Sequence, residues 1–572
     1  MSQGSLNERF SSVLESERIF ARLHLHHWVY LGVALAVTAL FLHSLTVGGS
    51  TWDELDHFKG IRQQVQFAWN VLSGSGDLNF RSAIDLGLAY YGLGTLLPAY
   101  AVSDLVDFLR GREHVLHESF TPIVYGFTFL TALATSWFVS RLVYEGTNNE
   151  RVSVYAGIAL LLVPPWIGYG FIDYKDVPLA AGVTACVCYA AAYVNRREER
   201  DLTAFFLALL FVGSQKLAGL PIVLPACIAV AFAALSPFTK GSFAVLTAFF
   251  LALLFVGSQK LAGLPIVPSA CIAVAIAALL PFTKRGFVVL ALHSLAFVFL
   301  LYLITPPAWV EPLQFFVSEL NHMAVHDFGS CTLTAGKCIG RNYHGGEDYS
   351  VLKYLSLWYA IQLPVLLLLA TLTALVFYLR FPNGNAKTRH LVAASIAWPC
   401  LALAVRNSTL YNGIRHTIFF VPLIVAFCFV NIPAQWWIAW RRWLAAYGIF
   451  LFIDMIAIHP NGYVWFNEPA RLIFDDKDYL TDYWYYSLRE AVGRLQQLAP
   501  DGSTVSGRPE DLVLPYVPFK YITADFPPKG VPFFYLSPPN LPACPTVERI
   551  ERRQLFAPKP LTLSHIGRCV PS

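Results

Sequence analysis

The sequence TWDELDHF occupies residues 51–58 and follows directly on a long apolar run that extends from Trp28 to Leu45. The run is close to the length of about 20 residues that an α-helix needs to cross a membrane. Two adjacent carboxylates, Asp53 and Glu54, come immediately after it. Because charged groups are costly inside a bilayer, we expect both to lie just outside it. The stretch therefore predicts a membrane span followed by acidic groups at the membrane surface.

The composition of the whole chain agrees with a membrane protein. Of 572 residues, 56% are hydrophobic and only 14% are charged, whereas soluble domains carry about 25% charged residues. The apolar runs are continuous, which excludes the alternating segments of about 10 residues that build a transmembrane barrel. The net charge of +4 gives no reason to expect nucleic acid as a partner. We predict an all-α polytopic membrane protein with about 13 transmembrane helices.

Lysine and arginine in the short loops predict the orientation of the chain, because cytoplasmic loops carry an excess of both. The basic loops, which we place in the cytoplasm, are residues 141–151, 195–201, 284–285, 380–389 and 441–442. The domain boundaries that follow are a cytoplasmic N-terminus at 1–26, a transmembrane domain at 27–460 and an extracytoplasmic domain at 461–572. The larger outer loops are residues 47–117 and 306–352, and the apolar stretch Leu86–Leu109 is interpreted as a helix along the outer face.

The chain after the last apolar run is mixed in polarity and predicts a small α/β domain outside the membrane. Residues 487–498 have the pattern of an amphipathic helix, and residues 504–517 and 533–536 have the pattern of strands. Cysteines outside the apolar runs pair by segment, Cys331 with Cys338 and Cys544 with Cys569. Because disulfides persist in oxidising compartments, this pairing supports the outside placement, with four unpaired thiols as the alternative.

An internal repeat lies in the middle of the chain. Residues 203–246 are restated almost unchanged as residues 247–290. A helix of about 36 apolar residues would reach about 54 Å, much more than the bilayer core of about 30 Å. We therefore expect each copy to be a helical hairpin that turns between Gly213 and Pro221. The lysine near each turn, Lys216 or Lys260, is either a functional intramembrane residue or a side chain that reaches the membrane surface.

A second acidic cluster lies at another predicted outer end, in the sequence FIDYKDVP of residues 171–178. Lys175 and Asp176 belong to it, and the ordinary alternative is a compensated surface pair. Two acidic clusters on one side of the membrane can hold a general base and orient a sugar or a cation. We expect Asp53 and Asp176 to converge within roughly one sugar diameter, about 10 Å.

Two further stretches carry polar residues at predicted outer ends of spans. Arg415 and His416 begin a late span, and arginine binds phosphate well through its planar fork. The alternative is an anchor at the level of the lipid headgroups. Residues 459–468, HPNGYVWFNE, are rich in aromatic side chains and by themselves fit a membrane-interface belt. The sequence has no nucleotide-binding glycine loop, no HExxH motif and no metal-type spacing of Cys and His.

Taken in order, these motifs resemble bacterial membrane glycosyltransferases of family 39, the dolichyl-phosphate-mannose protein mannosyltransferase-like group with the GT-C fold. The likeness rests on an acidic pair after a short first span, Lys-Asp-x-Pro at a later outer junction, and Arg-His before a late span. Further matches are the loop from residues 305–309 to the span entry at Trp358, residues 459–468 and residues 482–491, so the likeness covers residues 25 to about 495. The repeat and the tail after Asp501 depart from the family.

The resemblance implies a hexosyltransferase that takes a sugar from a polyprenyl phosphate and passes it to a protein, lipid or glycan acceptor. It implies that Asp53, with Glu54 beside it, and Asp176 are the catalytic acids, and that Arg415 lies near the lipid phosphate. We assign Lys175, His416 and His57 to substrate binding as well. No cofactor and no metal ligand is assigned, and the sequence leaves open whether a divalent metal takes part. The expected location is the bacterial inner membrane, with the active site facing outward.

The competing hypothesis is a transporter or flippase for lipid-linked or small polar solutes. In such a protein Asp53, Asp176 and Lys216 would form a relay. Transporters of this kind contain paired inverted repeats and broken helices in corresponding halves. The repeat in this chain is local and direct, so it does not favour the transporter, and a scaffold with a degenerate site is a third alternative.

Overall fold

The computed structural model describes residues 24–51, 53–84, 87–90, 93–111, 119–235, 284–325, 332–340, 349–381, 384–473, 478–507, 513, 516–518, 520–523, 532–537 and 544–570. Most of these residues are helical. Helices of the apolar body are α2 (Leu25–Val47), α6 (Thr121–Thr147), α7 (Glu150–Leu161), α8 (Pro164–Ile172), α9 (Asp176–Arg196), α10 (Glu199–Gln215), α11 (Leu224–Leu235), α14 (Lys284–Leu303), α16 (Val351–Gln362), α17 (Val365–Arg380), α18 (Ala386–Arg406), α19 (Phe420–Asn431) and α20 (Ala434–Ile458). The remaining helices are α3 (Glu54–Ser73), α4 (Phe80–Ala83), α5 (Leu93–Leu109), α15 (Pro312–Val325), α21 (Glu468–Ile473) and α22 (Leu488–Leu498).

Among the described residues, four helices are long and apolar enough to cross a membrane, and up to six spans result if each of two bent pairs is one span. The four are α2, α6, α9 and α18, and the bent pairs are α7 with α8 and α19 with α20. Three shorter apolar helices accompany them. Together they identify an integral membrane protein. The expected total of about 13 spans stays a prediction, since residues 236–283 lie outside the described part.

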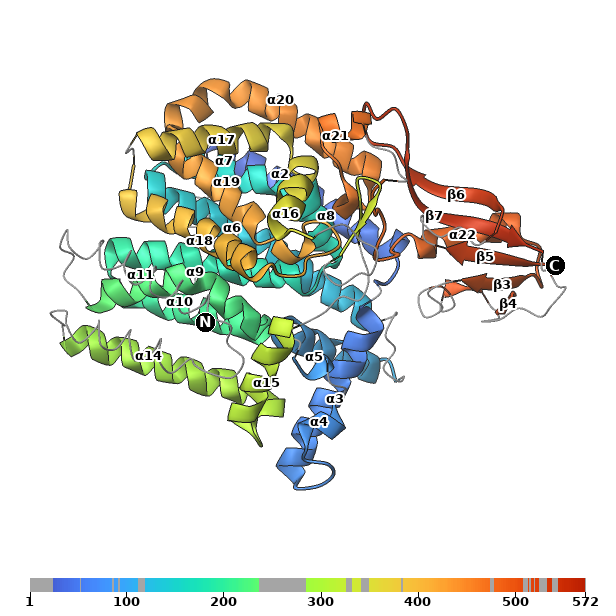
Figure 1. Ribbon diagram of the computed structural model, residues 1–572, viewed down its shortest axis with the longest axis horizontal. Helices are drawn as coiled ribbons and strands as arrows, with labels where there is room; N and C mark the ends of the chain where they lie inside the picture. Colours follow the sequence, from blue (N-terminus) through green and yellow to red (C-terminus); the bar gives the residue numbers. More distant parts are fainter. Residues whose placement is uncertain are drawn as a thin grey trace, which may run out of the picture.

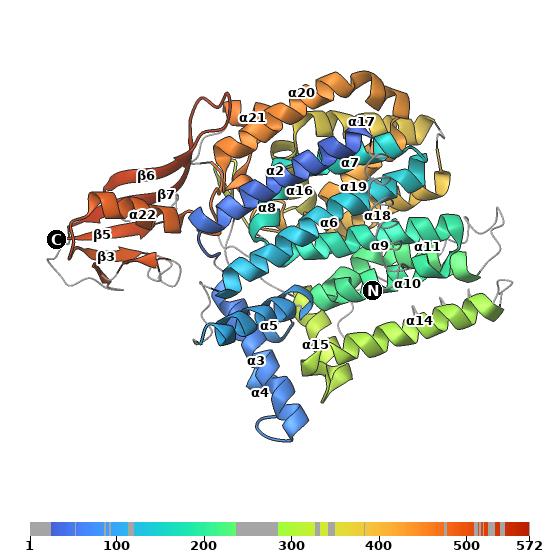
Figure 2. The ribbon, with the colours of Figure 1, turned by 180° about the vertical axis from the view of Figure 1, so that it is seen from behind.

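Helix α9 is the centre of the body. It packs against α6, α10 and α11, and 94% of the residues in its apolar 18-residue stretch are buried. Its sequence explains this position, because Ala180, Ala181 and Gly182 leave room for neighbouring helices to approach closely. Figures 1 and 2 show α9 surrounded by other helices, with α14 on the outside of the bundle. The start of α9 is therefore held from several sides, which matters for Asp176.

Pairs between arginine and acidic side chains mark one end of the bundle. At one end, the guanidinium of Arg196 pairs with Glu145 at 2.5 Å and with Asp201 at 3.0 Å, and Arg141 also pairs with Asp201, at 3.1 Å. The beginning of α18 joins this end, because Asn385 donates to Asn195. At the other end lie the end of α2 and the beginnings of α6 and α9. The first end carries the basic loops that the sequence places in the cytoplasm.

A five-stranded sheet lies beyond the second end of the bundle, at the right of Figure 1. Its strand order is β4 (Ile522–Thr523), β3 (Thr504–Gly507), β5 (Phe533–Ser537), β7 (Leu561–Cys569) and β6 (Thr546–Arg552). Helix α22 covers it with an apolar face that includes Leu488, Val492 and Leu495. Arg552 of β6 donates to the carbonyl of His459, so the sheet is attached to the end of α20.

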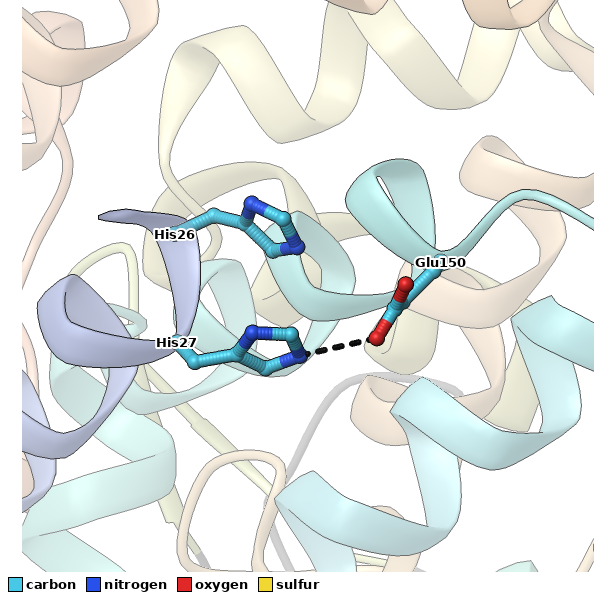
Figure 3. A group of neighbouring side chains, drawn as sticks. All are labelled: His26, His27 and Glu150. Atoms are coloured by element: carbon cyan, nitrogen blue, oxygen red, sulfur yellow. Dashed lines mark ion pairs between the residues drawn. The ribbon is translucent and has the colours of Figure 1, made fainter. Parts of the chain in front are cut away.

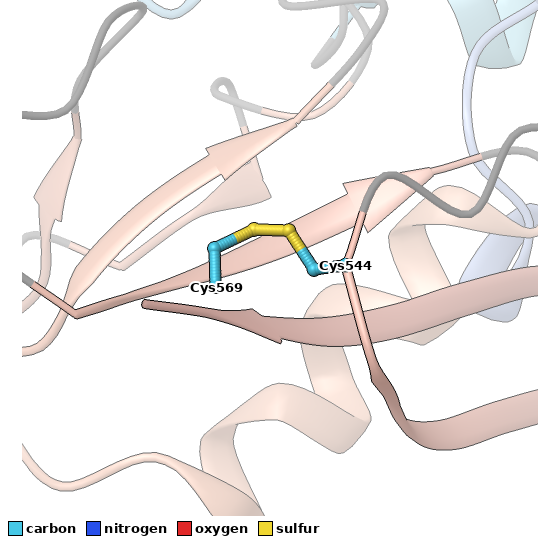
Figure 4. Close-up of a disulfide and its surroundings, with 2 residues drawn as sticks. All are labelled: Cys544 and Cys569. Carbon is cyan, nitrogen blue, oxygen red and sulfur yellow. A yellow bond between two sulfur atoms is a disulfide. The ribbon is translucent and has the colours of Figure 1, made fainter. Parts of the chain in front are cut away.

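The predicted disulfide between Cys544 and Cys569 is confirmed (Figure 4), with their Cα atoms 5.1 Å apart. It ties the start of the last hairpin to the end of β7. A two-stranded hairpin of β1 (Thr332–Thr334) and β2 (Lys337–Ile339) carries Cys338. Its expected partner, Cys331, lies outside the described residues, so that pairing stays a prediction. Cysteines 186, 188, 227, 400 and 428 are free and lie in apolar helices.

The first copy of the repeat has the expected hairpin form. Helix α10 ends at Gln215, a 3₁₀ segment follows at Leu217–Val223, and α11 continues from Leu224. The turn therefore lies where the sequence predicted it. Most of the second copy falls in residues 236–283, outside the described part, and only its end enters α14. The stretch expected along the outer face contains α5, whose Asp107 accepts from Ser119 in the segment before α6.

Candidate active site

Five charged side chains from four separate parts of the chain meet at the end of the bundle that faces the sheet. Asp53 is the residue before α3, and Lys175 and Asp176 mark the start of α9. Lys216 follows the end of α10. Arg415 opens a 3₁₀ turn at Arg415–Thr417, ahead of α19. Each residue lies at a helix end, so the chain delivers charged groups there without burying them along a span.

Arg415 joins the two aspartates that the sequence singled out. Its Nη2 atom lies 2.6 Å from Oδ2 of Asp53, and its Nε atom lies 3.3 Å from Oδ2 of Asp176. One guanidinium group therefore contacts both carboxylates, which brings them together as expected. The Arg415 side chain is only 5% exposed. Charge-assisted contacts of this kind are stronger than neutral ones and fix geometry as well.

Two lysines complete the cluster. The Nζ atom of Lys175 lies 2.7 Å from Oδ2 of Asp53, and the Nζ atom of Lys216 lies 2.6 Å from Oδ1 of Asp176. Three cations thus face two carboxylates. Although burial alone would raise the pKa of Asp53, the charges of Lys175 and Arg415 outweigh it and hold that pKa well below its ordinary value. Asp53 is therefore ionised at neutral pH while these partners hold it.

Two histidines of the cluster are uncharged at neutral pH. Burial, together with the positive charge of Lys175, holds the pKa of His57 well below its ordinary value. His57 Nε2 lies 3.2 Å from the Nζ atom of Lys175. Burial also lowers the pKa of His416 to about 3, despite the nearby Asp176. Neutral imidazoles can accept or donate one hydrogen bond without adding charge.

Asp173 is a third buried carboxyl group in this region. Its Oδ1 accepts from the backbone N–H of Asp176, 3.0 Å away. Burial, with the nearby charge of Asp176 as the second cause, raises the pKa of Asp173 above its ordinary value. Asp173 therefore keeps its proton to a higher pH than an exposed aspartate does.

Glu54 points away from the cations. Its Oε1 accepts from the backbone N–H of Thr51 at 2.7 Å and from the hydroxyl of Tyr125, and its Oε2 accepts from the hydroxyl of Thr121 at 2.6 Å. The side chain is fully buried. Both oxygens thus join the Thr51–Asp53 loop to the start of α6. The arrangement fixes the backbone beside Asp53, and the catalytic role expected for Glu54 stays a prediction.

Aromatic side chains close the cluster from the segment that leads to α22. The ring of Trp484 lies 4.6 Å from the guanidinium carbon of Arg415, a cation–π distance. Tyr483 donates to the hydroxyl of Tyr169 at 2.9 Å. Around the cluster, buried polar atoms without a hydrogen-bond partner among the described residues are Asp173 Oδ2, Tyr174 OH, His416 Nε2 and Trp484 Nε1. Such atoms in native proteins are usually satisfied by bound water or a ligand.

Residues 459–468 serve the packing around the site. Tyr463 and Trp465 are fully buried, and the indole N–H of Trp465 donates to Asp454 at 2.6 Å. Gly462 lies directly against Gly168 of α8, where any side chain would collide with the backbone. The aromatic residues of this stretch thus support the body of the protein, and the membrane-belt alternative does not describe these two side chains.

Sequence reasoning missed two members of the cluster. Lys216 was left between a functional and a surface role, and its contact with Asp176 is visible only in three dimensions. Trp484 fell within a matched stretch but carried no separate signal. The His/Cys/Asp/Glu group that could hold a metal within the described residues is His26, His27 and Glu150, outside this cluster.

No protein-family model matches the sequence, and no curated protein matches it. The chain is similar to ArnT from Cupriavidus metallidurans bound to undecaprenyl phosphate, with 12% identity, a TM-score of 0.43, and coverage of 95% of this chain and 98% of that chain. It is also similar to the archaeal oligosaccharyltransferase AglB from Archaeoglobus fulgidus in complex with an inhibitory peptide and a dolichol-phosphate. That likeness has 12% identity and a TM-score of 0.46, and it covers 91% of this chain and 70% of that chain. At these values, the function has to be inferred from the side chains of the site.

Proposed function

We propose that the protein is a membrane glycosyltransferase that moves a sugar from a polyprenyl phosphate to an acceptor hydroxyl. The observation that carries the proposal is the contact of Arg415 with both Asp53 and Asp176, with Lys175 and Lys216 beside them. Excess positive charge at the end of an apolar helix bundle suits an anionic group attached to a lipid tail. Family 39 membership, a hexose as the transferred sugar and an outward-facing site belong to the same proposal.

In this proposal the cations bind and stabilise the phosphate. When the bond between the sugar carbon C1 and the phosphate oxygen breaks, the electron pair stays on the lipid phosphate. Arg415, Lys175 and Lys216 are placed to neutralise that charge. Arginine suits the task because its planar fork fits two phosphate oxygens at once. No nucleotide is needed, which agrees with a sequence that has no nucleotide-binding glycine loop.

Asp53 is the proposed general base. It accepts the proton of the acceptor hydroxyl while the acceptor oxygen forms its bond to C1. With Lys175 and Arg415 bound, the pKa of Asp53 is too low for an efficient base. A donor phosphate that binds Lys175 and Arg415 in place of Asp53 would free the Asp53 carboxylate. The pKa of Asp53 would then rise. The base thus becomes effective when the donor is in place.

The test uses purified full-length protein in lipid nanodiscs, undecaprenyl phosphate bearing labelled mannose or glucose as the donor, and native membranes as the acceptor source. Wild type is expected to transfer label. Asp53→Asn is expected to lower transfer by about 100-fold or more, because the base is lost. Binding of undecaprenyl phosphate itself is expected not to weaken in Asp53→Asn, because Asp53 competes with the phosphate for Lys175 and Arg415. It is expected to weaken in Arg415→Ala, because a charge-assisted contact is lost.

Asp77→Asn is the matched control, because Asp77 is an exposed carboxylate that contacts Ser82 in the segment around α4. It should transfer label as wild type does. Full activity in Asp53→Asn would remove the catalytic assignment. Flux of intact donor across vesicles, with no transferred label in wild type for any sugar, would instead favour the transporter.

A further inference from the structure

Three side chains with metal-binding atoms meet at the bundle end opposite the candidate active site. His26 and His27 lie in the first turn of α2, and Glu150 is the first residue of α7. Figure 3 shows the two imidazole rings side by side and facing the carboxylate. His27 Nε2 lies 3.1 Å from Oε1 of Glu150, and one candidate ligand atom from each residue lies within 4.8 Å of the others.

The distances are close to those of a metal site. Zinc binds imidazole nitrogen and carboxylate oxygen at about 2.0–2.2 Å, so ligand atoms around a tetrahedral ion lie about 3.3–3.5 Å apart. The His27–Glu150 distance is close to this value, and the longest separation, which is at most 4.8 Å, needs to shrink by at most about 1.4 Å. The Glu150 side chain is 60% exposed and can make that adjustment by rotating. Ligand geometry therefore allows a metal ion without movement of the helices.

The two histidines also have unused nitrogen atoms. His26 Nε2 and His27 Nδ1 are buried and have no hydrogen-bond partner among the described residues. A buried imidazole nitrogen without a partner is costly, and a metal ion at this place would satisfy His26 Nε2. His27 would bind the same ion through Nε2, the nitrogen that faces Glu150. The ring of His24 stacks beside them, with its centroid 5.5 Å from that of His26. Three imidazoles and one carboxylate thus gather within a single turn of α2 and the start of α7.

We propose that His26, His27 and Glu150 form a binding site for a divalent transition metal of the zinc type. Imidazole with carboxylate suits zinc, copper, nickel and iron, whereas magnesium and calcium prefer all-oxygen sites. Helix α2 has 23 residues and is about 34 Å long, so the site is far from Asp53. The ion would link two helices and take no part in sugar transfer.

The role of the link follows from the packing of α2. Only 17% of the residues in the apolar 18-residue stretch of α2 are buried, and α2 contacts mainly α7, on one side. The C-terminal end of the same helix leads into the loop that carries Asp53 and Glu54. A metal ion between the first residues of α2 and α7 would fasten a helix that is otherwise held along one side. Bound metal should therefore raise thermal stability.

The experiment uses full-length protein with a tag that contains no histidine, stripped with a chelator and then dialysed against Zn²⁺ or Co²⁺. We expect about one metal ion per chain by elemental analysis, and a visible absorption band with Co²⁺. His26→Asn, His27→Asn and Glu150→Gln are each expected to weaken Zn²⁺ binding by about 10-fold or more, because loss of a direct ligand costs at least as much as loss of an outer-shell partner. Zn²⁺ should raise the Tm of wild type and not that of the variants.

His293→Asn is the matched control, since His293 lies on α14 and contacts Thr203, away from the cluster. It should bind metal and respond to Zn²⁺ as wild type does. If wild type retains no metal after dialysis, the cluster is only a His27–Glu150 ion pair and the proposal is overturned. Equal metal binding by wild type and all three variants would overturn it as well. Elution profiles and helical content of the variants show that each is folded.

Discussion

Asp53 and Glu54 are neighbours in the chain but have different surroundings. Asp53 contacts Lys175 and Arg415, whereas Glu54 accepts from Thr51, Thr121 and Tyr125. Position relative to the start of α3 explains the difference, because successive residues of a helix point about 100° apart. From the sequence, the two residues were interpreted as one acidic motif. In the structure one member faces the cations and the other holds the loop in place.

Glu54→Ala is expected to destabilise the protein. The substitution leaves the buried donors of Thr51, Thr121 and Tyr125 without an acceptor, and each unsatisfied group costs about 1–3 kcal/mol. Thermal unfolding followed by loss of monodisperse protein in detergent would measure the effect. Glu54→Gln keeps one acceptor oxygen and should fall between wild type and Glu54→Ala. A Tm for Glu54→Ala equal to that of wild type would mean that the buried contacts contribute nothing.

Asp173 makes the stability of the site depend on pH. Because burial and Asp176 raise the pKa of Asp173 in the folded protein, the folded state binds a proton there more tightly than the unfolded state. The stabilisation of the folded state by this proton is fully present below the pKa of an unfolded aspartate, about 3.9. It is lost as the pH rises through the pKa of Asp173 in the folded protein. The Tm of wild type, relative to that of Asp173→Asn, should therefore fall as the pH is raised from about 4 to about 8. Parallel Tm profiles for the two proteins would contradict the raised pKa.

At the scale of elements, helix ends bring the charged residues together. Asp53 follows α2, Asp176 begins α9, Lys216 follows α10, and Arg415 precedes α19. Consecutive helices that cross a membrane return to the same side in pairs, so alternate ends meet there. The first copy of the repeat supplies one of these residues, since Lys216 lies in its turn. The repeat is thus part of the candidate site, in its first copy.

Lys216 and Lys260 occupy equivalent positions in the two copies, and their substitution should have different effects. Lys216→Ala leaves the buried carboxylate of Asp176 without its ammonium partner, so sugar transfer should fall by about 10-fold or more. Lys260→Ala is the matched control and should transfer normally, because the first copy already supplies the lysine. Measurement of label transfer in both variants decides the point. A loss confined to Lys260→Ala would assign the site to the second copy.

At the scale of the whole molecule, the basic loops and the candidate site lie at opposite ends of the helix bundle. Arg141, Arg196 and Arg389 belong to the end opposite the sheet, where they pair with Asp201, Glu145 and Asn431. The cluster around Asp53 and the five-stranded sheet lie at the other end. Because basic loops face the cytoplasm, this distribution predicts an outward-facing site and sheet.

Cysteine labelling in intact cells should reveal the orientation. We expect a membrane-impermeant maleimide to react with Ile522→Cys, on the exposed strand β4, without permeabilisation. Arg200→Cys, at the exposed start of α10, should react only after the membrane is opened. The parent protein, whose free cysteines in the described part of the chain are buried or half-buried, is the background control. The reverse pattern would place the cluster in the cytoplasm.

Several features of this protein follow from local sequence alone. Apolar runs predict helices because their backbone must bond internally in lipid, and α2, α6, α9 and α18 are confirmed as helices of that kind. The turn of the first repeat copy and the Cys544–Cys569 disulfide were also predicted correctly. Each depends on residues within one segment or on two cysteines 25 positions apart.

The contacts within the candidate site were decided by the tertiary structure. The bond from Arg415 to Asp53 joins residues 362 positions apart, and the bond from Lys216 to Asp176 joins residues on two helices. No periodicity in the sequence encodes such distances, because packing of α9 against α6 and α10 sets which helix ends meet. The same packing turned Glu54 towards Tyr125 and brought Trp484 onto Arg415. Local sequence thus determined that charged groups lie at helix ends, and long-range packing determined which of them face each other.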